Sequence, residues 1–238
     1  HSDEYNGDLY GDGENFFRAM SYHMSRMQTP SLMVAMNQLS NHDHSRFLTR
    51  TNQVVGRIGS AGAEKANEGV KKGVLREAVM IQMTWPGAPT LYYGDEAGLC
   101  GWTDPDNRRT YPWGKEDYEL IEYHRYMITL HKNLPALLYG SLKQLLADWQ
   151  LIAYGRMYKT NQCVVVINNG ESRRYAEIPV WELGVCDGQV MYRLMLSYGD
   201  GYNAGIEGYE VKDGKLALDL AGYSAMLFSI GAGALGVK

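Results

Sequence analysis

Apolar residues recur at intervals of three and four along three segments of the first half of the chain, which is the spacing of one face of an α-helix. Residues 14–27, 64–85 and 118–132 carry this pattern and are predicted to be amphipathic helices. Two short apolar runs, at residues 32–39 and 89–93, lie between them and end in polar residues, so we expect buried strands there. The order helix, strand, helix, strand, helix predicts parallel strands joined by crossover helices.

The pattern changes beyond about residue 140, where short β-branched and aromatic runs alternate with turn residues and predict strands. These runs are residues 151–158, 163–168, 175–180, 190–196, 216–220 and 224–230. Asn169-Gly170 and Asp213-Gly214 are dipeptides typical of hairpin turns. Regularly spaced short strands favour a small antiparallel sandwich. We therefore predict two domains, residues 1–134 and 135–238, with the boundary near Pro135.

Composition excludes several classes of protein. The formal net charge is −4 with both signs interspersed, so a nucleic-acid partner is not expected, and the apolar runs are too short to span a membrane. Cys100, Cys163 and Cys186 are an odd number at wide spacing, which favours reduced packing residues over a disulfide scaffold or a zinc site. This slightly favours a cytoplasmic over a secreted protein. No basic and apolar leader opens the chain, so we expect no signal peptide.

The first candidate site is Asn41-His42-Asp43, at the end of the first predicted strand. Active sites of parallel barrels form at the carboxyl ends of their strands, where a carboxylate beside an imidazole suits sugar binding. The residues alone leave other interpretations open. Asp43 also fits a cap on a following helix. His42 and His44 also fit a metal site, although no third ligand is specified.

The second candidate site follows the second predicted strand. Gly87–Gly98 reads GAPTLYYGDEAG, and its adjacent Asp95 and Glu96 cannot both point across one scissile bond, so we do not interpret them as an acid–base pair. The residues alone also fit acids that are solvated at the end of a structural strand. The loop DPDNRR, residues 104–109, comes next and has aromatic residues on both sides. Acids and arginine bind sugar hydroxyls, and aromatic rings stack on sugars. The alternative is a solvated loop with weak internal ion pairs.

In this order, Asn41-His42-Asp43 and Gly87–Gly98 resemble the fourth conserved region and the eighth barrel strand of the α-amylase family, glycoside hydrolase family 13. The resemblance covers residues 1 to about 230. It implies an α/β plus all-β fold: the last two to three βα elements of a (β/α)8 TIM barrel, followed by a C-terminal antiparallel β-sandwich. The loop at residues 104–109 is similar to that of the neopullulanase and cyclomaltodextrinase branch.

The resemblance assigns structural bonds to Asp95 and Glu96, and it implies functional roles for four other residues. Asp43 matches the family's third catalytic carboxylate, which stabilises the oxocarbenium-like transition state without attacking the sugar. His42 would bind the sugar at the cleavage subsite, and Asp104 and Arg108 would contact glucose units on the non-reducing side. We therefore expect α-glucan oligosaccharides as ligands, and neither a metal nor another cofactor within this chain.

The resemblance leaves two catalytic groups without a counterpart. Retaining hydrolysis needs two cooperating carboxylates, and in the family the nucleophile and the general acid lie upstream of the NHD strand, where this chain has only about forty residues. We predict the C-terminal part of a retaining α-glucan hydrolase, inactive alone, whose partner is the N-terminal remainder of the enzyme. That remainder would hold any calcium. The alternatives are a non-catalytic glucan-binding or partner-binding module, and one half of a nicked or split amylase.

Two weaker features complete the predictions. Residues 6–12 faintly resemble a calcium loop, but Tyr10 and Phe17 occupy positions where the EF-hand pattern requires ligands, so we expect an ordinary loop. Trp149 and Trp181 fall in the predicted sandwich. We expect both to pack in its core in preference to forming a starch-binding surface.

Overall fold

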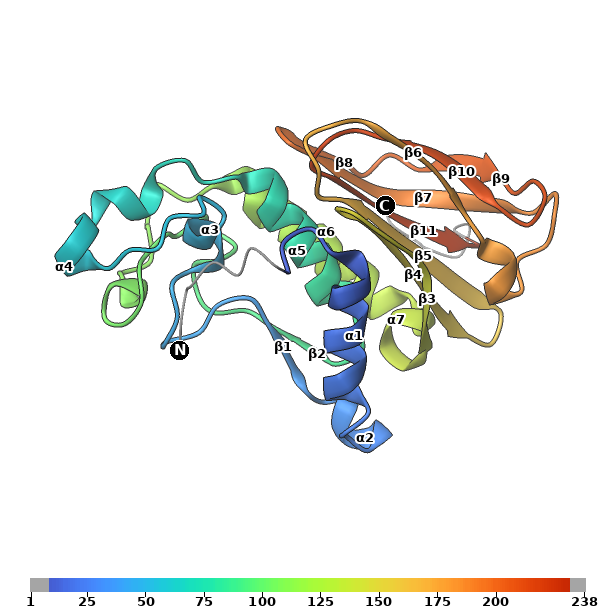
Figure 1. Ribbon diagram of the computed structural model, residues 1–238, viewed down its shortest axis with the longest axis horizontal. Coiled ribbons are helices and arrows are strands. Elements are labelled where there is room, and N and C mark those ends of the chain that lie inside the picture. Colours follow the sequence, from blue (N-terminus) through green and yellow to red (C-terminus); the bar gives the residue numbers. More distant parts are fainter. Residues whose placement is uncertain (1–8, 232–238) are drawn as a thin grey trace.

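The computed structural model describes residues 9–231 (Figure 1). The first half contains α1 (Gly13–Met24), α2 (Thr29–Leu32), β1 (Met36–Gln38), α3 (Phe47–Arg50), α4 (Ile58–Ala61), η1 (Glu64–Asn67), α5 (Lys72–Thr84), β2 (Ala88–Thr90), η2 (Asp106–Arg108), α6 (Tyr118–Asn133) and α7 (Pro135–Tyr139). The second half contains β3 (Ser141–Asp148), β4 (Leu151–Tyr158), β5 (Asn161–Asn168), β6 (Arg174–Ile178), η3 (Val180–Leu183), β7 (Val190–Tyr198), β8 (Gly201–Asn203), β9 (Glu207–Glu210), β10 (Leu216–Leu220) and β11 (Ser224–Ile230).

The three predicted helices are present as α1, α5 and α6. α1 begins where the Asp12 carboxylate accepts a hydrogen bond from the backbone N–H of Asn15 at 2.9 Å. The predicted helix at 64–85 is broken in its first half, because Gly69 has a φ of +67° and separates η1 from α5. Gly73 lies within α5. Glycine suits this position because a Cβ there would come within 3.0 Å of the Gly199 Cα.

The strands β1 and β2 pair in parallel, as predicted, with Met36 opposite Ala88. Each strand has only three residues. The prediction that the first strand is buried is wrong, because Met36 is 63% exposed and the preceding Val34 is 71% exposed. The pattern of apolar residues indicated a covered strand, but no described residue covers this face. A closed barrel stays a prediction.

The large sheet is antiparallel and has the strand order β3-β4-β5-β11-β7-β8, with β9 also paired to β7. A two-stranded sheet, β10-β6, lies beside it. All six predicted strands are present, and β3, β8 and β9 were not predicted. Asn169-Gly170 is not a hairpin turn, because β5 lies in the large sheet and β6 in the small one. Asp213-Gly214 forms a tight turn with Lys212 opposite Lys215, but the strands around it also belong to different sheets.

The large sheet lies between the helices on one face and β6 and β10 on the other (Figure 1), and its central strands are buried on both faces. On β5, Cys163, Val165 and Ile167 belong to the core that the sheet shares with the helices. Val164 and Val166 belong to a second core, against β6 and β10. A strand covered on both faces is continuously apolar, which accounts for the run from residue 163 to 167. The helix-side core joins residues from both sides of the predicted domain boundary. The division of the chain into two domains stays a prediction.

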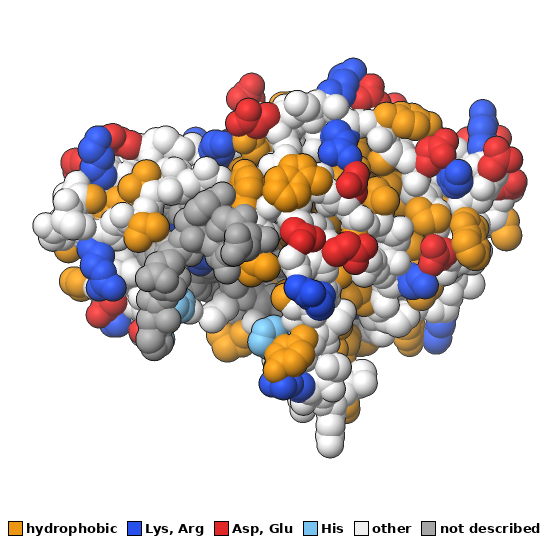
Figure 2. Space-filling view, viewed as in Figure 1, with side chains coloured by type: hydrophobic (Ala, Val, Ile, Leu, Met, Phe, Trp, Pro, Cys, Tyr) orange, Lys and Arg blue, Asp and Glu red, His pale blue; other side chains and the backbone are white. Residues whose placement is uncertain are grey.

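Several packing predictions are wrong. Cys100 and Cys163 are buried as expected, but Cys186 is exposed. Trp149 and Trp181 are 55% and 60% exposed, so they do not pack in the core. The face in Figure 2 shows acidic and basic side chains interspersed. Within residues 9–231, no helix combines the length and the apolar character that crossing a membrane requires.

Candidate functional site

The loop that follows β1 presents His42 and Asp43 to solvent. The Asn41 side-chain oxygen accepts hydrogen bonds from the backbone N–H groups of Asp43, at 2.9 Å, and His44, at 3.2 Å. This Asx turn fixes the backbone and leaves the His42 and Asp43 side chains 65% and 55% exposed. His42 Nε2 lies 3.4 Å from Asp43 Oδ1. An imidazole and a carboxylate therefore stand together at the carboxyl end of a parallel strand.

The two alternative interpretations of this loop can be compared with the geometry. Asp43 does not cap α3, because the Ser40 hydroxyl accepts the hydrogen bond from the first backbone N–H of that helix, at Phe47. Among the described residues, no group of three or more His, Cys, Asp or Glu side chains is arranged to hold a metal ion. Only part of the faint calcium loop at 6–12 lies within the described residues.

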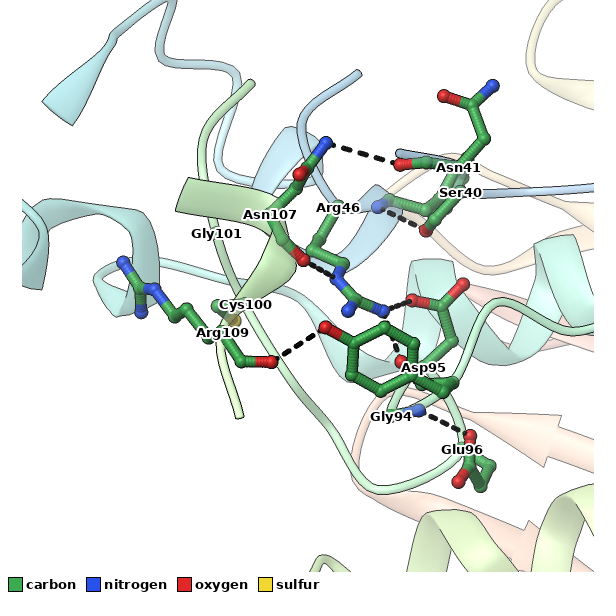
Figure 3. A network of polar contacts seen from close by, with 12 residues as sticks. Ser40, Asn41, Arg46, Gly94, Asp95, Glu96, Cys100, Gly101, Asn107 and Arg109 are labelled. Atoms are coloured by element: carbon green, nitrogen blue, oxygen red, sulfur yellow. Dashed lines mark hydrogen bonds and ion pairs between the residues drawn. The ribbon is translucent and has the colours of Figure 1, made fainter. Parts of the chain in front are cut away.

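Arg46 is the centre of the polar network beneath this loop (Figure 3). Its side chain is fully buried and forms an ion pair with Asp95 at 3.0 Å. It also donates to the backbone carbonyls of Tyr93, at 2.6 Å, and Asn107, at 2.8 Å. The guanidinium carbon lies 4.1 Å from the centre of the Tyr92 ring, a cation–π contact. One side chain thus joins the loop after β1 to the segment after β2.

The electrostatics of this network are structural. Burial raises the pKa of Asp95, and hydrogen bonds from Ser40 and Arg46 oppose the effect. Glu96 accepts a hydrogen bond from the backbone N–H of Gly94 at 2.9 Å. The prediction that Asp95 and Glu96 make structural bonds is confirmed.

Asn107 makes the second connection between the loops. Its side-chain amide donates to the carbonyl of Asn41 at 3.2 Å and to the carbonyl of His44 at 2.7 Å. Asn107 is fully buried within η2. Because these two carbonyls flank His42 and Asp43, the position of the exposed pair depends on the segment after β2.

The loop at residues 104–109 contains two ion pairs of different character. Asp106 and Arg109 form a largely buried pair, in which Arg109 Nη2 lies 2.7 Å from Asp106 Oδ2. Asp104 and Arg108 form an exposed pair, at 2.5 Å and about half accessible. The inner pair holds the loop, and the outer pair leaves charged groups open to solvent on either side of Asn107.

The structure thus joins the NHD loop and the DPDNRR loop, and two residues that the sequence did not single out make the connection. These are Arg46 and Asn107, which are polar and fully buried. Asp43 is an exposed carboxylate of this site, whereas Asp95 is bonded to Arg46 and Glu96 accepts a hydrogen bond from Gly94. This arrangement can bind hydroxyl groups and stabilise positive charge.

Comparison with known proteins finds relatives of this chain. The "Alpha amylase, catalytic domain" family matches residues 6–136. The amylopullulanase of Thermoanaerobacter thermohydrosulfuricus is 31% identical over 217 residues, which are 85% of this chain and 14% of the relative. Neopullulanase 2 of Thermoactinomyces vulgaris is 32% identical over 197 residues, 80% of this chain and 28% of the relative.

The fold is also shared with a solved structure. The Anoxybacillus α-amylase has a TM-score of 0.72 at 22% identity, over 97% of this chain and 43% of that one. This chain therefore spans less than a third of the two curated relatives and less than half of the solved amylase. Because the family match extends over more than half of the chain and includes both loops of the candidate site, the chain belongs to the α-amylase family of glycoside hydrolases.

Proposed function

We propose that this chain forms part of a retaining α-glucan hydrolase in which Asp43 stabilises the transition state and His42 binds the sugar. The observation that carries the proposal is the exposed His42–Asp43 pair on an Asx turn at the carboxyl end of β1. Asp43 would accept hydrogen bonds from hydroxyls of the distorted sugar ring. Those bonds strengthen as positive charge develops on the ring, so they lower the barrier more than they strengthen ground-state binding.

The substrate is proposed to be an α-1,4- or α-1,6-linked glucan. Asp104 and Arg108 would contact glucose units on the non-reducing side, where their exposed pair offers both acceptors and donors. The buried Arg109–Asp106 pair and the Asn107 amide would hold this surface against the NHD loop. The printed names of the relatives, amylopullulanase and neopullulanase, support a glucan over other sugars.

We propose that the nucleophile and the general acid come from the remainder of a (β/α)8 barrel outside this chain. The support is chemical, because the carboxylates near Asp43 at positions 95 and 96 are committed to structural bonds. The exposed strand β1 offers an edge on which further parallel strands would pair. On this proposal, residues 1–134 belong to the barrel and residues 135–238 to the C-terminal sheet domain. This part of the mechanism requires no metal or other cofactor.

The test compares hydrolysis of maltoheptaose by the 238-residue chain with hydrolysis by the longer polypeptide that contains the upstream strands. We expect turnover only from the longer form. In that form Asp43→Asn should lower kcat by about 10²–10³-fold, the loss typical of one transition-state contact. Since the Asp43 side chain is 55% exposed, the melting temperature of the variant should equal that of the parent. Hydrolysis by the chain alone, or full activity in Asp43→Asn, would refute the proposal.

A non-catalytic glucan-binding module is the second candidate. The observation in its favour is the core that runs without interruption from α1 and α5 to β11, which is typical of a unit that folds by itself. Denaturing intact mass of the purified protein separates the two candidates. A single 26.8 kDa species that binds glucan without hydrolysis favours the module. A second, co-purifying polypeptide favours a nicked or split enzyme.

A further inference from the structure

A polar hollow of about 420 Å³ lies where the strands of the large sheet end, between the start of α5 and the turns before β4 and β11. We call it the strand-end groove, and its lining includes Gln53, Lys71, Gln150, Glu171, Arg174 and Tyr223. Lys71, Glu171 and Tyr223 also line an adjoining hollow of about 630 Å³. None of these residues belongs to the Asp43 site. Both volumes are in the range of ligand pockets, about 300–1,000 Å³.

The backbone of the groove is unusual. Five described residues other than glycine have φ in the left-handed region, and three of them, Gln53, Gln150 and Tyr223, line this groove. Their φ angles are +59°, +55° and +50°. Glycine adopts this conformation without the strain that a Cβ introduces, and strained residues cluster at functional sites. The clustering of three large side chains at such positions in one groove points to a functional role for them.

The charged groups in the groove already have partners. The Lys71 ammonium donates to the Tyr223 hydroxyl at 2.8 Å, and that hydroxyl donates to Glu171 at 3.0 Å. Arg174 is paired with Asp148 at 2.6 Å. A groove whose cations are already paired is poorly suited to phosphate or another anion, since each cation has an acidic partner in Glu171 or Asp148.

The glutamine amides are available to a ligand. Each amide has two donors and an acceptor, and neither Gln53 nor Gln150 makes a side-chain hydrogen bond to another described residue. Gln150 follows Trp149, which is 55% exposed. The ring centroid of Trp149 lies 6.5 Å from that of Tyr10, another residue of the groove. Paired donors and acceptors beside an exposed aromatic ring match a sugar, which presents hydroxyls at its edge and C–H groups on its face.

We propose that the strand-end groove is a second, non-catalytic site that binds a neutral oligosaccharide. Gln53 and Gln150 bond its hydroxyls, and Trp149 supplies a stacking surface at the rim. The identification of that oligosaccharide as an α-glucan rests on the proposed function. The inference that the ligand is neutral and rich in hydroxyls rests on the groove itself.

The test is isothermal titration of the intact protein with maltoheptaose. The measurements are made in an Asp43→Ala, Asp104→Ala background, which removes the two proposed carboxylate contacts of the other site. In that background, replacing Gln53 and Gln150 with glycine should raise Kd at least tenfold. Glycine suits both backbone conformations, so these variants lose the amides and keep the fold. Trp149→Ala should raise Kd by a similar factor.

Matched controls come from the other two left-handed positions. Lys159→Gly and Asp213→Gly make the same change at φ angles of +52° and +51°, away from the groove, and should leave Kd unchanged. An unchanged Kd in the Gln53→Gly, Gln150→Gly protein would overturn the proposal, as would loss of all binding in the Asp43→Ala, Asp104→Ala background. If the groove binds glucan but Asp43→Asn does not reduce hydrolysis, the proposed function is refuted and the proposal of a second binding site still holds.

Discussion

Glu77 provides a sharp test of how burial controls stability in this chain. It lies on α5, is 3% exposed, and accepts a hydrogen bond from the Asn169 amide at 2.5 Å on one of its two oxygens. The other oxygen has no partner among the described residues. Burial raises the pKa of Glu77 from 4.5 to about 8, against opposing effects of Asn169 and Arg76.

The sign of the effect follows from where the proton is bound. Between pH 4.5 and 8 the folded state keeps the proton of Glu77 and the unfolded state releases it. The free energy of unfolding therefore falls as pH rises through this window and is unaffected by Glu77 below it. Each pH unit is worth about 1.4 kcal/mol. The full loss above pH 8 is therefore about 5 kcal/mol for a group this deeply buried.

Urea unfolding of the parent chain and Glu77→Gln at pH 5, 7 and 9 measures this loss. Glutamine does not ionise and can keep the bond from Asn169, but its buried amide N–H groups lack an acceptor, which costs about 1–3 kcal/mol. The variant should therefore be less stable than the parent at pH 5 and about 2–4 kcal/mol more stable at pH 9, so the two curves cross.

Two comparisons make the Glu77 measurement specific. Burial lowers the pKa of His124 and His131, so both histidines reduce stability as pH falls, equally in parent and variant. Glu122→Gln is the control, since Glu122 lies on a helix, is 54% exposed, and should change stability by less than about 1 kcal/mol at each pH. Parallel curves for the parent and Glu77→Gln would refute the argument from burial.

Four further outcomes are expected. Arg46→Met should lower the free energy of unfolding by about 3–5 kcal/mol in urea, because it leaves Asp95 buried without its partner. Asn107→Ala should cost about 1–3 kcal/mol and also lower kcat of an active form, because it releases the turn that presents Asp43. Arg156→Met should cost about 2–4 kcal/mol in the same assay, since this buried side chain bonds carbonyls at the ends of α5 and α7. Lys159→Gly should raise the melting temperature slightly, because it relieves the strain of a left-handed φ. The expected gain in the free energy of unfolding is about 0.5–1 kcal/mol.

The sequence predicted elements whose signal is local. Helical spacing predicted α1, α5 and α6, and β-branched runs predicted six strands. The wrong predictions concern which other elements cover or pair with a given segment. The apolar run before Asn41 predicted a buried strand, but burial depends on a covering layer, and Met36 is exposed. Asn169-Gly170 has the residues of a hairpin turn, but the carbonyl of Gly170 bonds to the N–H of Tyr223 and the chain passes to the other sheet.

In the candidate site, too, the sequence predicted the residues with a local signal and missed those whose role depends on long-range contacts. His42 and Asp43 could be identified because they stand in a recognisable run at a strand end. Arg46 and Asn107 could not, because an arginine or an asparagine in a polar loop is normally solvated. Their burial follows from contacts between segments about fifty to sixty residues apart, such as the bond from Arg46 to the carbonyl of Asn107. No periodicity in a single sequence records such a pairing.

The sheet contributes to the site through α5. Arg76 on this helix is buried and donates to the carbonyls of Tyr198 and Gly199 at the end of β7, both at 2.8 Å. Six residues further along α5, the Gln82 amide donates to the carbonyl of Asn37 in β1, at 3.1 Å, and to that of Thr90 in β2, at 2.9 Å. One helix thus bonds the large sheet and both strands from which the site loops extend. Because the β1–β2 pair has only three residues per strand and one uncovered face, it cannot hold its own position. The antiparallel sheet therefore acts as the support that, through α5, keeps the loop of His42 and Asp43 in place.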